Sequence, residues 1–139
     1  MAVRYTTISV KSRGDCDIID ITQQVAESLA ESGVTEGIVH VFVVGSTAAI
    51  TTVEYEPGLV GDLQRLFEQI APQDASYEHD ARWHDGNGHA HVRASLVGPS
   101  LIVPVRKGQL MLGAWQQIIM IDFDNRPRNR ELVLQAMGE

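Results

Sequence analysis

The chain has 139 residues, a formal net charge of −7 and a single cysteine. This length suits one domain with its own hydrophobic core, and we expect a single domain over residues 1–139. Cys16 alone excludes an intramolecular disulfide, the acidic balance argues against a nucleic-acid partner, and no apolar run approaches the ~18 residues that a membrane partner would require.

The first two predicted elements are a strand and a helix. Residues 4–10 are rich in β-branched side chains, which favour a strand. This start alternates in polarity and lacks the apolar block of a signal peptide, so we expect a cytoplasmic protein. In residues 21–33, apolar side chains recur every fourth position and Gly33 follows as a stop, which predicts an amphipathic helix.

A second strand is predicted over residues 37–44, which are apolar except for His40. A single histidine in such a strand is more often a hydrogen-bonded core residue than a ligand, and we interpret His40 in that way. Gly45, Ser46 and Thr47 follow at the strand end. Their small side chains and hydroxyl groups suit either an anion-binding loop or a tight bend between two strands.

The next strand extends through Val53. A break at Pro57 and Gly58 then precedes a second amphipathic helix, which ends at Pro72. Its exposed carboxylates are typical of a solvated helix face, so we place no site on it.

The stretch from Tyr77 to Gly98 contains four of the five histidines. Asp85 to Gly88 has the composition of a turn, and residues 89–98 alternate with period two. The alternation predicts a strand with one face formed by His89, His91, Arg93 and Ser95. Two imidazoles on one strand face can share a metal ion when a third ligand arrives, and His79 or His84 from the preceding loop is the candidate.

The C-terminal third predicts two strands within residues 101–124, joined at Lys107 and Gly108, and a closing strand over residues 131–137. Trp115 lies near Gly113, where an aromatic side chain suits core packing or a pocket wall. Three arginines precede the closing strand and suit either a solvated turn or a phosphate clamp: Arg126, Arg128 and Arg130.

Two helices among about seven strands predict an α+β fold, with an antiparallel β-sandwich-like core and two helices packed to one side. No internal repeat, P-loop, dinucleotide fingerprint or G-x-S-x-G elbow is present.

Six segments occur in order between about residue 4 and Glu139: GSTAAITTVEYEPG, YEHD, HAHVRASLVG, VPVRKGQL, LGAWQ and RPRNR. Together they resemble the YjbQ-like family of small cytosolic proteins, a family of secondary thiamine-phosphate synthases. The resemblance implies a β-sandwich-like α+β fold and a homotrimer with clefts between or beside the subunits. The implied activity joins hydroxymethylpyrimidine diphosphate to thiazole phosphate and releases pyrophosphate.

The resemblance also implies site residues. The family's recurrent polar residues fall on Glu54, His79, Asp80, His91, Ser95, Trp115, Gln116, Arg128 and Arg130. We assign catalysis to Glu54, His79 and His91. We assign substrate binding to seven residues, which are Ser46, Thr47, Ser95, Trp115, Gln116, Arg128 and Arg130.

This chain departs from the family pattern at Gly45, where many members have a histidine. We hypothesise that His89 restores the lost group, with His84 as the alternative. The predicted ligands of a divalent ion, zinc or magnesium, are therefore His79, Asp80, His89 and His91. Such a histidine-rich set suits zinc better than magnesium.

The implied chemistry needs charge neutralisation on the departing pyrophosphate, which the ion and the arginines at 128 and 130 would supply. Two alternatives remain open. One is a metal-dependent hydrolase of a small phosphorylated or ester substrate, with Glu54 as proton acceptor. The other is a non-catalytic module that binds a phosphorylated metabolite.

Overall fold

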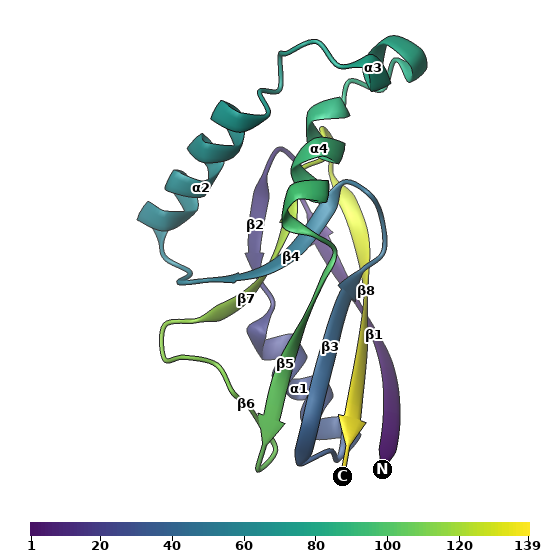
Figure 1. Ribbon diagram of the computed structural model, residues 1–139, viewed down its shortest axis with the longest axis vertical. Coiled ribbons are helices and arrows are strands. Elements are labelled where there is room, and N and C mark those ends of the chain that lie inside the picture. Colours follow the sequence, from purple (N-terminus) through teal and green to yellow (C-terminus); the bar gives the residue numbers. More distant parts are fainter.

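The closing strand lies near the centre of the larger of two antiparallel sheets in the computed structural model, which describes residues 1–139 (Figure 1). β8 (Arg128–Gly138) pairs with β1 (Ala2–Ser12) on one side and β3 (Glu36–Val43) on the other. β5 (Ser100–Arg106) and the short β6 (Gln109–Leu110) extend the sheet beyond β3. The strand order is thus β1-β8-β3-β5-β6, and the strands predicted over residues 4–10, 37–44 and 131–137 are confirmed.

The smaller sheet has three antiparallel strands. β7 (Gln117–Asp122) lies between β2 (Asp17–Asp20) and β4 (Ala48–Val53). Its side chains are buried on both faces. Ile118 and Met120 join the core beneath the larger sheet, whereas Ile119 and Ile121 join a second core on the other face.

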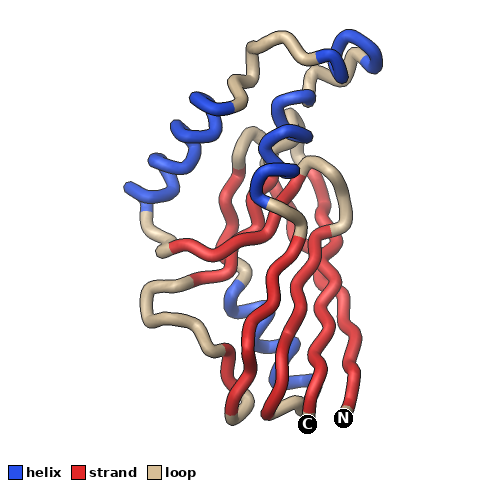
Figure 2. The backbone as a smooth tube through the Cα atoms, in the orientation of Figure 1, coloured by secondary structure: helices blue, strands red, loops and turns tan.

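Four helices complete the fold: α1 (Thr22–Ser32), α2 (Pro57–Ile70), α3 (Glu78–Trp83) and α4 (Gly88–Val97). α1 packs its buried stripe into the core beneath the larger sheet and ends at Gly33, whose φ of 74° is left-handed, as expected of a helix stop. α2 and α4 pack on the far face of the smaller sheet through Phe67 and Ala90. The α+β class and the antiparallel sheets are confirmed, with two more helices than predicted (Figure 2). None of the helices is long and apolar enough to span a bilayer.

The strand predicted over residues 89–98 is wrong, because this segment forms α4. Residues two apart on a helix point to opposite sides, so His89 and His91 do not share a face. His89 is 1% exposed beside α2, whereas His91 is half-buried beside α3. Residues four apart do share a face, which places Arg93 with His89.

The hairpin predicted within residues 101–124 is only half correct. Lys107 and Gly108 both have positive φ, as a type I′ turn requires, and they join β5 to β6. The chain then leaves the larger sheet after Leu110, and β7 enters the smaller sheet instead.

The outer face of the larger sheet has no helix over it (Figure 1). The register places Tyr5, Gln135, His40 and Ile102 in one row across four strands. Tyr5 and Ile102 are exposed, and His40 is half-buried on this face with its ring centroid 6.3 Å from that of Phe42. His40 is therefore not the hydrogen-bonded core residue that we expected.

Candidate functional site

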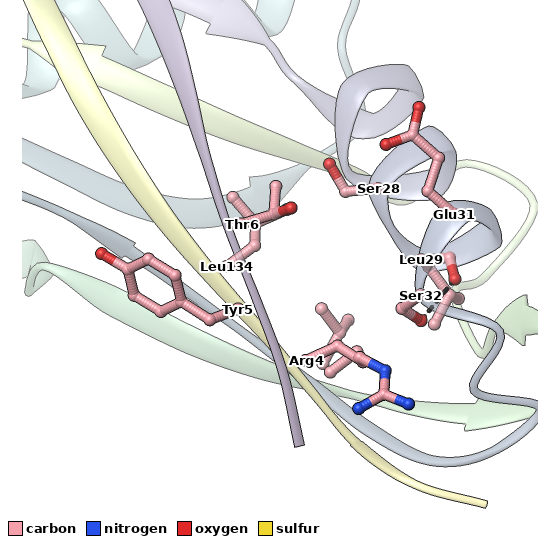
Figure 3. A pocket seen from close by; sticks show the side chains of 10 residues that line it. Arg4, Tyr5, Thr6, Ser28, Leu29, Glu31, Ser32 and Leu134 are labelled. Atoms are coloured by element: carbon pink, nitrogen blue, oxygen red, sulfur yellow. Dashed lines mark hydrogen bonds between the residues drawn. The ribbon is translucent and has the colours of Figure 1, made fainter. Parts of the chain in front are cut away.

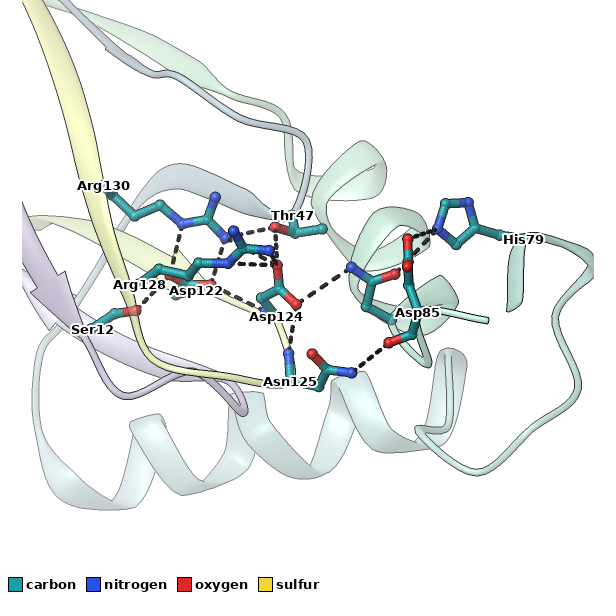
Figure 4. A network of polar contacts seen from close by, with 10 residues as sticks. Ser12, Thr47, His79, Asp85, Asp122, Asp124, Asn125, Arg128 and Arg130 are labelled. Atoms are coloured by element: carbon teal, nitrogen blue, oxygen red, sulfur yellow. Dashed lines mark hydrogen bonds and ion pairs between the residues drawn. The ribbon is translucent and has the colours of Figure 1, made fainter. Parts of the chain in front are cut away.

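The site begins where β7 of the smaller sheet passes into β8 of the larger one. Asp122 and Asp124 alternate at the end of β7, and Arg128 and Arg130 alternate at the start of β8, so the two pairs face each other (Figure 4). Arg130 donates two hydrogen bonds to Asp122, from Nε to Oδ2 at 2.7 Å and from Nη2 to Oδ1 at 2.8 Å. Both side chains are buried, and Ser12 Oγ donates a further hydrogen bond to Asp122 at 2.5 Å.

The second pair, Arg128 with Asp124, lies closer to the protein surface, because Arg128 is partly exposed. Arg128 donates two hydrogen bonds to Asp124 Oδ2, from Nη2 at 2.7 Å and Nε at 3.1 Å. Thr47 bridges the two pairs, because its hydroxyl accepts from Arg130 Nη2 at 2.6 Å and donates to Asp124 Oδ2 at 2.9 Å. The side chain of Arg128 is one-third exposed, so this arginine can still contact a ligand.

Asp124 is a buried carboxylate that stays ionised. Burial alone would raise its pKa, but hydrogen bonds from the backbone N–H of Asn125, from Thr47 and from Arg128 outweigh burial and hold the pKa below its ordinary value. The ionised group is therefore a fixed negative charge at the floor of the site.

Asn87 links this carboxylate to the histidines. Its Nδ2 donates to Asp124 Oδ1 at 3.4 Å, and its Oδ1 lies 3.1 Å from His79 Nε2. An amide oxygen only accepts, so Nε2 of His79 carries the hydrogen in this contact. Asn87 is the N-cap residue of α4 but makes no side-chain capping bond, because its amide is engaged in this bridge.

His79 of α3 and His91 of α4 form a close ring pair, with centroids 4.3 Å apart and planes tilted by 49°. Burial and the neighbouring His79 lower the pKa of His91, so its imidazole is neutral at physiological pH. Asp85 Oδ2 lies 3.6 Å from His79 Nε2. Asp80 instead accepts a hydrogen bond from the backbone N–H of Gly88 at 2.9 Å and so fixes the start of α4 against α3.

An open cleft of about 350 Å³ lies beside this network. Its lining is entirely polar, with His84, Asp85, Asn87, Asp124, Asn125, Arg126 and Arg128. Arg126 is exposed and has no ion pair or hydrogen bond within the chain. Two guanidinium groups, at 126 and 128, are thus available to an anion that enters the cleft.

The structure brings only part of the predicted site together. Thr47 and Arg130 lie behind the cleft, with their polar groups bonded inside the junction, while Ser46 is exposed on the loop beside them. Ser95 is exposed on α4, one turn beyond His91. Among the predicted phosphate ligands, only Arg128 lines the cleft.

Glu54, Trp115 and Gln116 form a separate group at the far end of β4. Glu54 follows β4 and Thr47 precedes it, and a strand rises ~3.3 Å per residue, so the two are roughly 23 Å apart. Gln116 is anchored there by a hydrogen bond to Thr52 Oγ1 at 3.1 Å, and Trp115 is 75% exposed. Within one chain these three residues do not reach the cleft.

The predicted four-ligand metal set is not assembled in this chain. Asp80 is engaged with Gly88, His89 faces α2, and only His79 and His91 remain together. No group of three or more histidine, cysteine, aspartate or glutamate side chains is placed to hold a metal ion. The donor set of a single chain therefore does not fit a resident metal ion.

The buried Arg130 explains why glycine occupies position 45, and this explanation does not involve His89. Its φ is 130°, and a Cβ at this position would lie 2.8 Å from Nη1 of Arg130. Glycine thus leaves room for the buried arginine. His89 is not near enough to replace a side chain at position 45, since it lines a different cleft with Arg93 and Glu68.

A further cavity of about 250 Å³ lies between β1 and α1 (Figure 3). Its floor includes Leu29 and Leu134, and Arg4 and Glu31 stand at its rim. None of the histidines lines this cavity, so we place the candidate site at the sheet junction.

The sequence-based prediction did not include three buried members of the network, which are Asn87, Asp122 and Asp124. The signal was present in DFDNRPRNR, where acidic and basic residues alternate two apart on either side of a turn. Such spacing pairs Asp with Arg across a corner between strands.

The fold and the network define a small α+β protein with a polar, histidine-edged cleft at the junction of two antiparallel sheets. The chain belongs to the YjbQ-like family, because the family model described as "UPF0047 protein YjbQ-like" matches residues 6–139. This confirms the resemblance seen in the sequence.

Two relatives and one solved structure match the chain over nearly their whole length. The chain is 38% identical to a UPF0047 protein of Archaeoglobus fulgidus, covering 94% of this chain and 98% of the relative. It is 37% identical to UPF0047 protein YugU of Bacillus subtilis, covering 95% and 98%. Among solved structures, a protein of unknown function from Sulfolobus solfataricus P2 superposes with a TM-score of 0.90 at 31% identity, covering 99% of this chain and 100% of that one.

Replacing Gly45 by alanine tests the constraint imposed by Arg130. We expect Gly45→Ala to lower the free energy of unfolding by about 1–3 kcal/mol, because the new Cβ meets the guanidinium at a strained φ. Urea denaturation measures the change. Gly113→Ala is the matched control, since a Cβ there meets its neighbours at ordinary distances of 3.6 and 3.7 Å. Equal stability of the two variants would contradict the constraint.

The lowered pKa of Asp124 predicts a pH-dependent contribution to stability. An unfolded aspartate has a pKa of ~3.9, so the contribution is complete above that pH and is lost as the pH falls through the lower folded-state pKa. We expect Asp124→Asn to cost about 3 kcal/mol at neutral pH and progressively less in acid. Denaturation of both proteins across the acid range measures this, with exposed Asp74→Asn as control. A difference that stays constant into strong acid would refute it.

Proposed function

We propose that the cleft at the sheet junction binds the phosphate groups of a small phosphorylated metabolite. The observation that carries the proposal is the combination of two available guanidinium groups, Arg126 and Arg128, with the His79–His91 pair at the edge of the same network. Arginine matches phosphate oxygens with paired N–H groups, and the neutral imidazole of His91 adds one N–H donor. The buried charge of Asp124 holds Arg128 in place without using all of its donors.

We further propose that the bound substrate is a pyrimidine-methyl diphosphate and that the reaction forms thiamine phosphate. The C–O bond to the diphosphate breaks, its electron pair leaves with pyrophosphate, and the thiazole nitrogen forms the new C–N bond. Negative charge therefore develops on the departing pyrophosphate. Arginine and histidine donors aimed at those oxygens would stabilise that charge in the transition state.

Formation of thiamine phosphate from the two precursors, with magnesium, zinc or a chelator present, tests the reaction. We expect product to form faster than without protein, and His91→Gln to lower kcat by about 10²–10³ because the flexible amide does not hold its N–H at the position of the imidazole donor. Arg126→Gln should mainly raise KM, because it weakens phosphate binding. Lys11→Gln, an exposed change on β1, is the control and should leave both constants unchanged.

The same assay separates the alternatives. Release of pyrophosphate without thiazole phosphate, and without thiamine phosphate, would indicate a hydrolase. Binding of the diphosphate that depends on Arg126, with no turnover under any condition, would indicate a non-catalytic phosphometabolite-binding module. Turnover that depends on added zinc would support the predicted role of a divalent metal ion in the reaction.

A homotrimer in the cytoplasm stays our prediction for the assembly and its location. The exposed apolar side chains on the outer face of the larger sheet, including Val3, Tyr5 and Ile102, support association between copies. Light scattering during gel filtration should give a solution mass near three times the 15.3 kDa chain. We expect Ile102→Glu to lower that mass, and a wild-type monomer at micromolar concentration would contradict the prediction.

A further inference from the structure

A second polar cleft, of about 430 Å³, lies on the opposite side of α4 from the His79–His91 pair. The β1–β2 turn, α2 and the face of α4 that carries His89 enclose it. Its polar lining residues are Asp15, Gln64, Arg65, Glu68, Gln73, His89 and Arg93. No part of this lining belongs to the site at the sheet junction.

Two of the lining residues are buried polar groups. Arg93 is 4% exposed and is fixed by hydrogen bonds from Nε to the backbone oxygen of Ala71 at 2.9 Å and from Nη2 to Glu68 at 2.8 Å. His89, one turn earlier on the same helix face, is 1% exposed, and its Nδ1 has no hydrogen-bond partner. Buried polar atoms are usually paired, so an unpaired imidazole nitrogen beside a cleft marks hydrogen-bonding capacity that the chain itself does not use.

The side chains that line the cleft carry equal numbers of positive and negative charges. Two cations, Arg65 and Arg93, and two anions, Asp15 and Glu68, line it. Arg65 forms an exposed ion pair with Asp62 on α2. Exposed pairs of this kind are weak, so a ligand carboxylate can readily replace Asp62 as the partner of Arg65. A phosphate would meet both carboxylates, and a metal cation would meet both arginines. A small molecule that carries one positive and one negative group avoids both conflicts.

We infer that this cleft binds a zwitterionic α-amino acid with a small polar side chain. Its carboxylate lies toward Arg65 and Arg93, its ammonium group lies toward Asp15 and Glu68, and its side chain meets the amides of Gln64 and Gln73. The volume is within the range of small-molecule sites. Nearly all of the lining is polar, so apolar amino acids are the weaker ligands.

Calorimetric titration of the whole protein with glycine, L-serine and L-glutamine at millimolar concentrations tests the inference. Saturable binding is expected, with propionate and ethylamine, which each carry one of the two charges, at least about tenfold weaker. Arg65→Gln and Asp15→Asn should each weaken amino-acid binding by about tenfold. Both changes spare the fold, since Arg65 is exposed and asparagine tolerates the φ of 54° at position 15. Arg82→Gln on α3, outside the cleft, is the matched control.

The inference is overturned if none of the three amino acids binds, if inorganic phosphate binds in their place, or if both cleft variants bind as tightly as wild type. Binding at this cleft is independent of the chemistry at the sheet junction. His91→Gln should therefore leave amino-acid affinity unchanged. Its effect on the formation of thiamine phosphate is measured separately.

Discussion

The pairing of Asp122 with Arg130 is the interaction on which the rest of the site depends. It joins the last residue of β7, the middle strand of the smaller sheet, to β8 of the larger one, with both side chains buried. Removing two charges from water is costly, and the cost is offset by two parallel hydrogen bonds and by the hydroxyls of Ser12 and Thr47. Either partner left alone would be an uncompensated buried charge, so the two sheets are held in one relative position.

From this junction a continuous series of contacts leads outward to the histidines. Thr47 connects the buried pair to Asp124, Asn87 connects Asp124 to His79, and His79 packs on His91. The series begins with buried side chains at the junction of the sheets and ends at the half-buried His79 and His91. The groups that we propose to meet a ligand are thus positioned by others that do not, an arrangement suited to precise recognition.

Much of the fold was predictable because helix α1 and strands β1, β3 and β8 display their periodicity in apolar side chains. Helix α4 was not, since its buried faces carry Ala90, Ala94, His89 and Arg93, and buried polar residues conceal the helical period. The site was predictable only in part. Family resemblance identified His79, His91 and Arg128, but transfer by position carries no distances, and so it joined Glu54 and Trp115 to a cleft that lies at the other end of β4.

The turn of α4 also determines what each histidine can affect. His89 and His91 are separated by one residue, yet they project from opposite sides of the helix: His89 toward residues of α2, and His91 against His79 of α3. A substitution at position 89 therefore acts first on the packing of α2, and one at position 91 acts first on the packing of α3. What the two positions share is the backbone between them, where Ala90 has no exposed surface and leaves the helix no room to rotate.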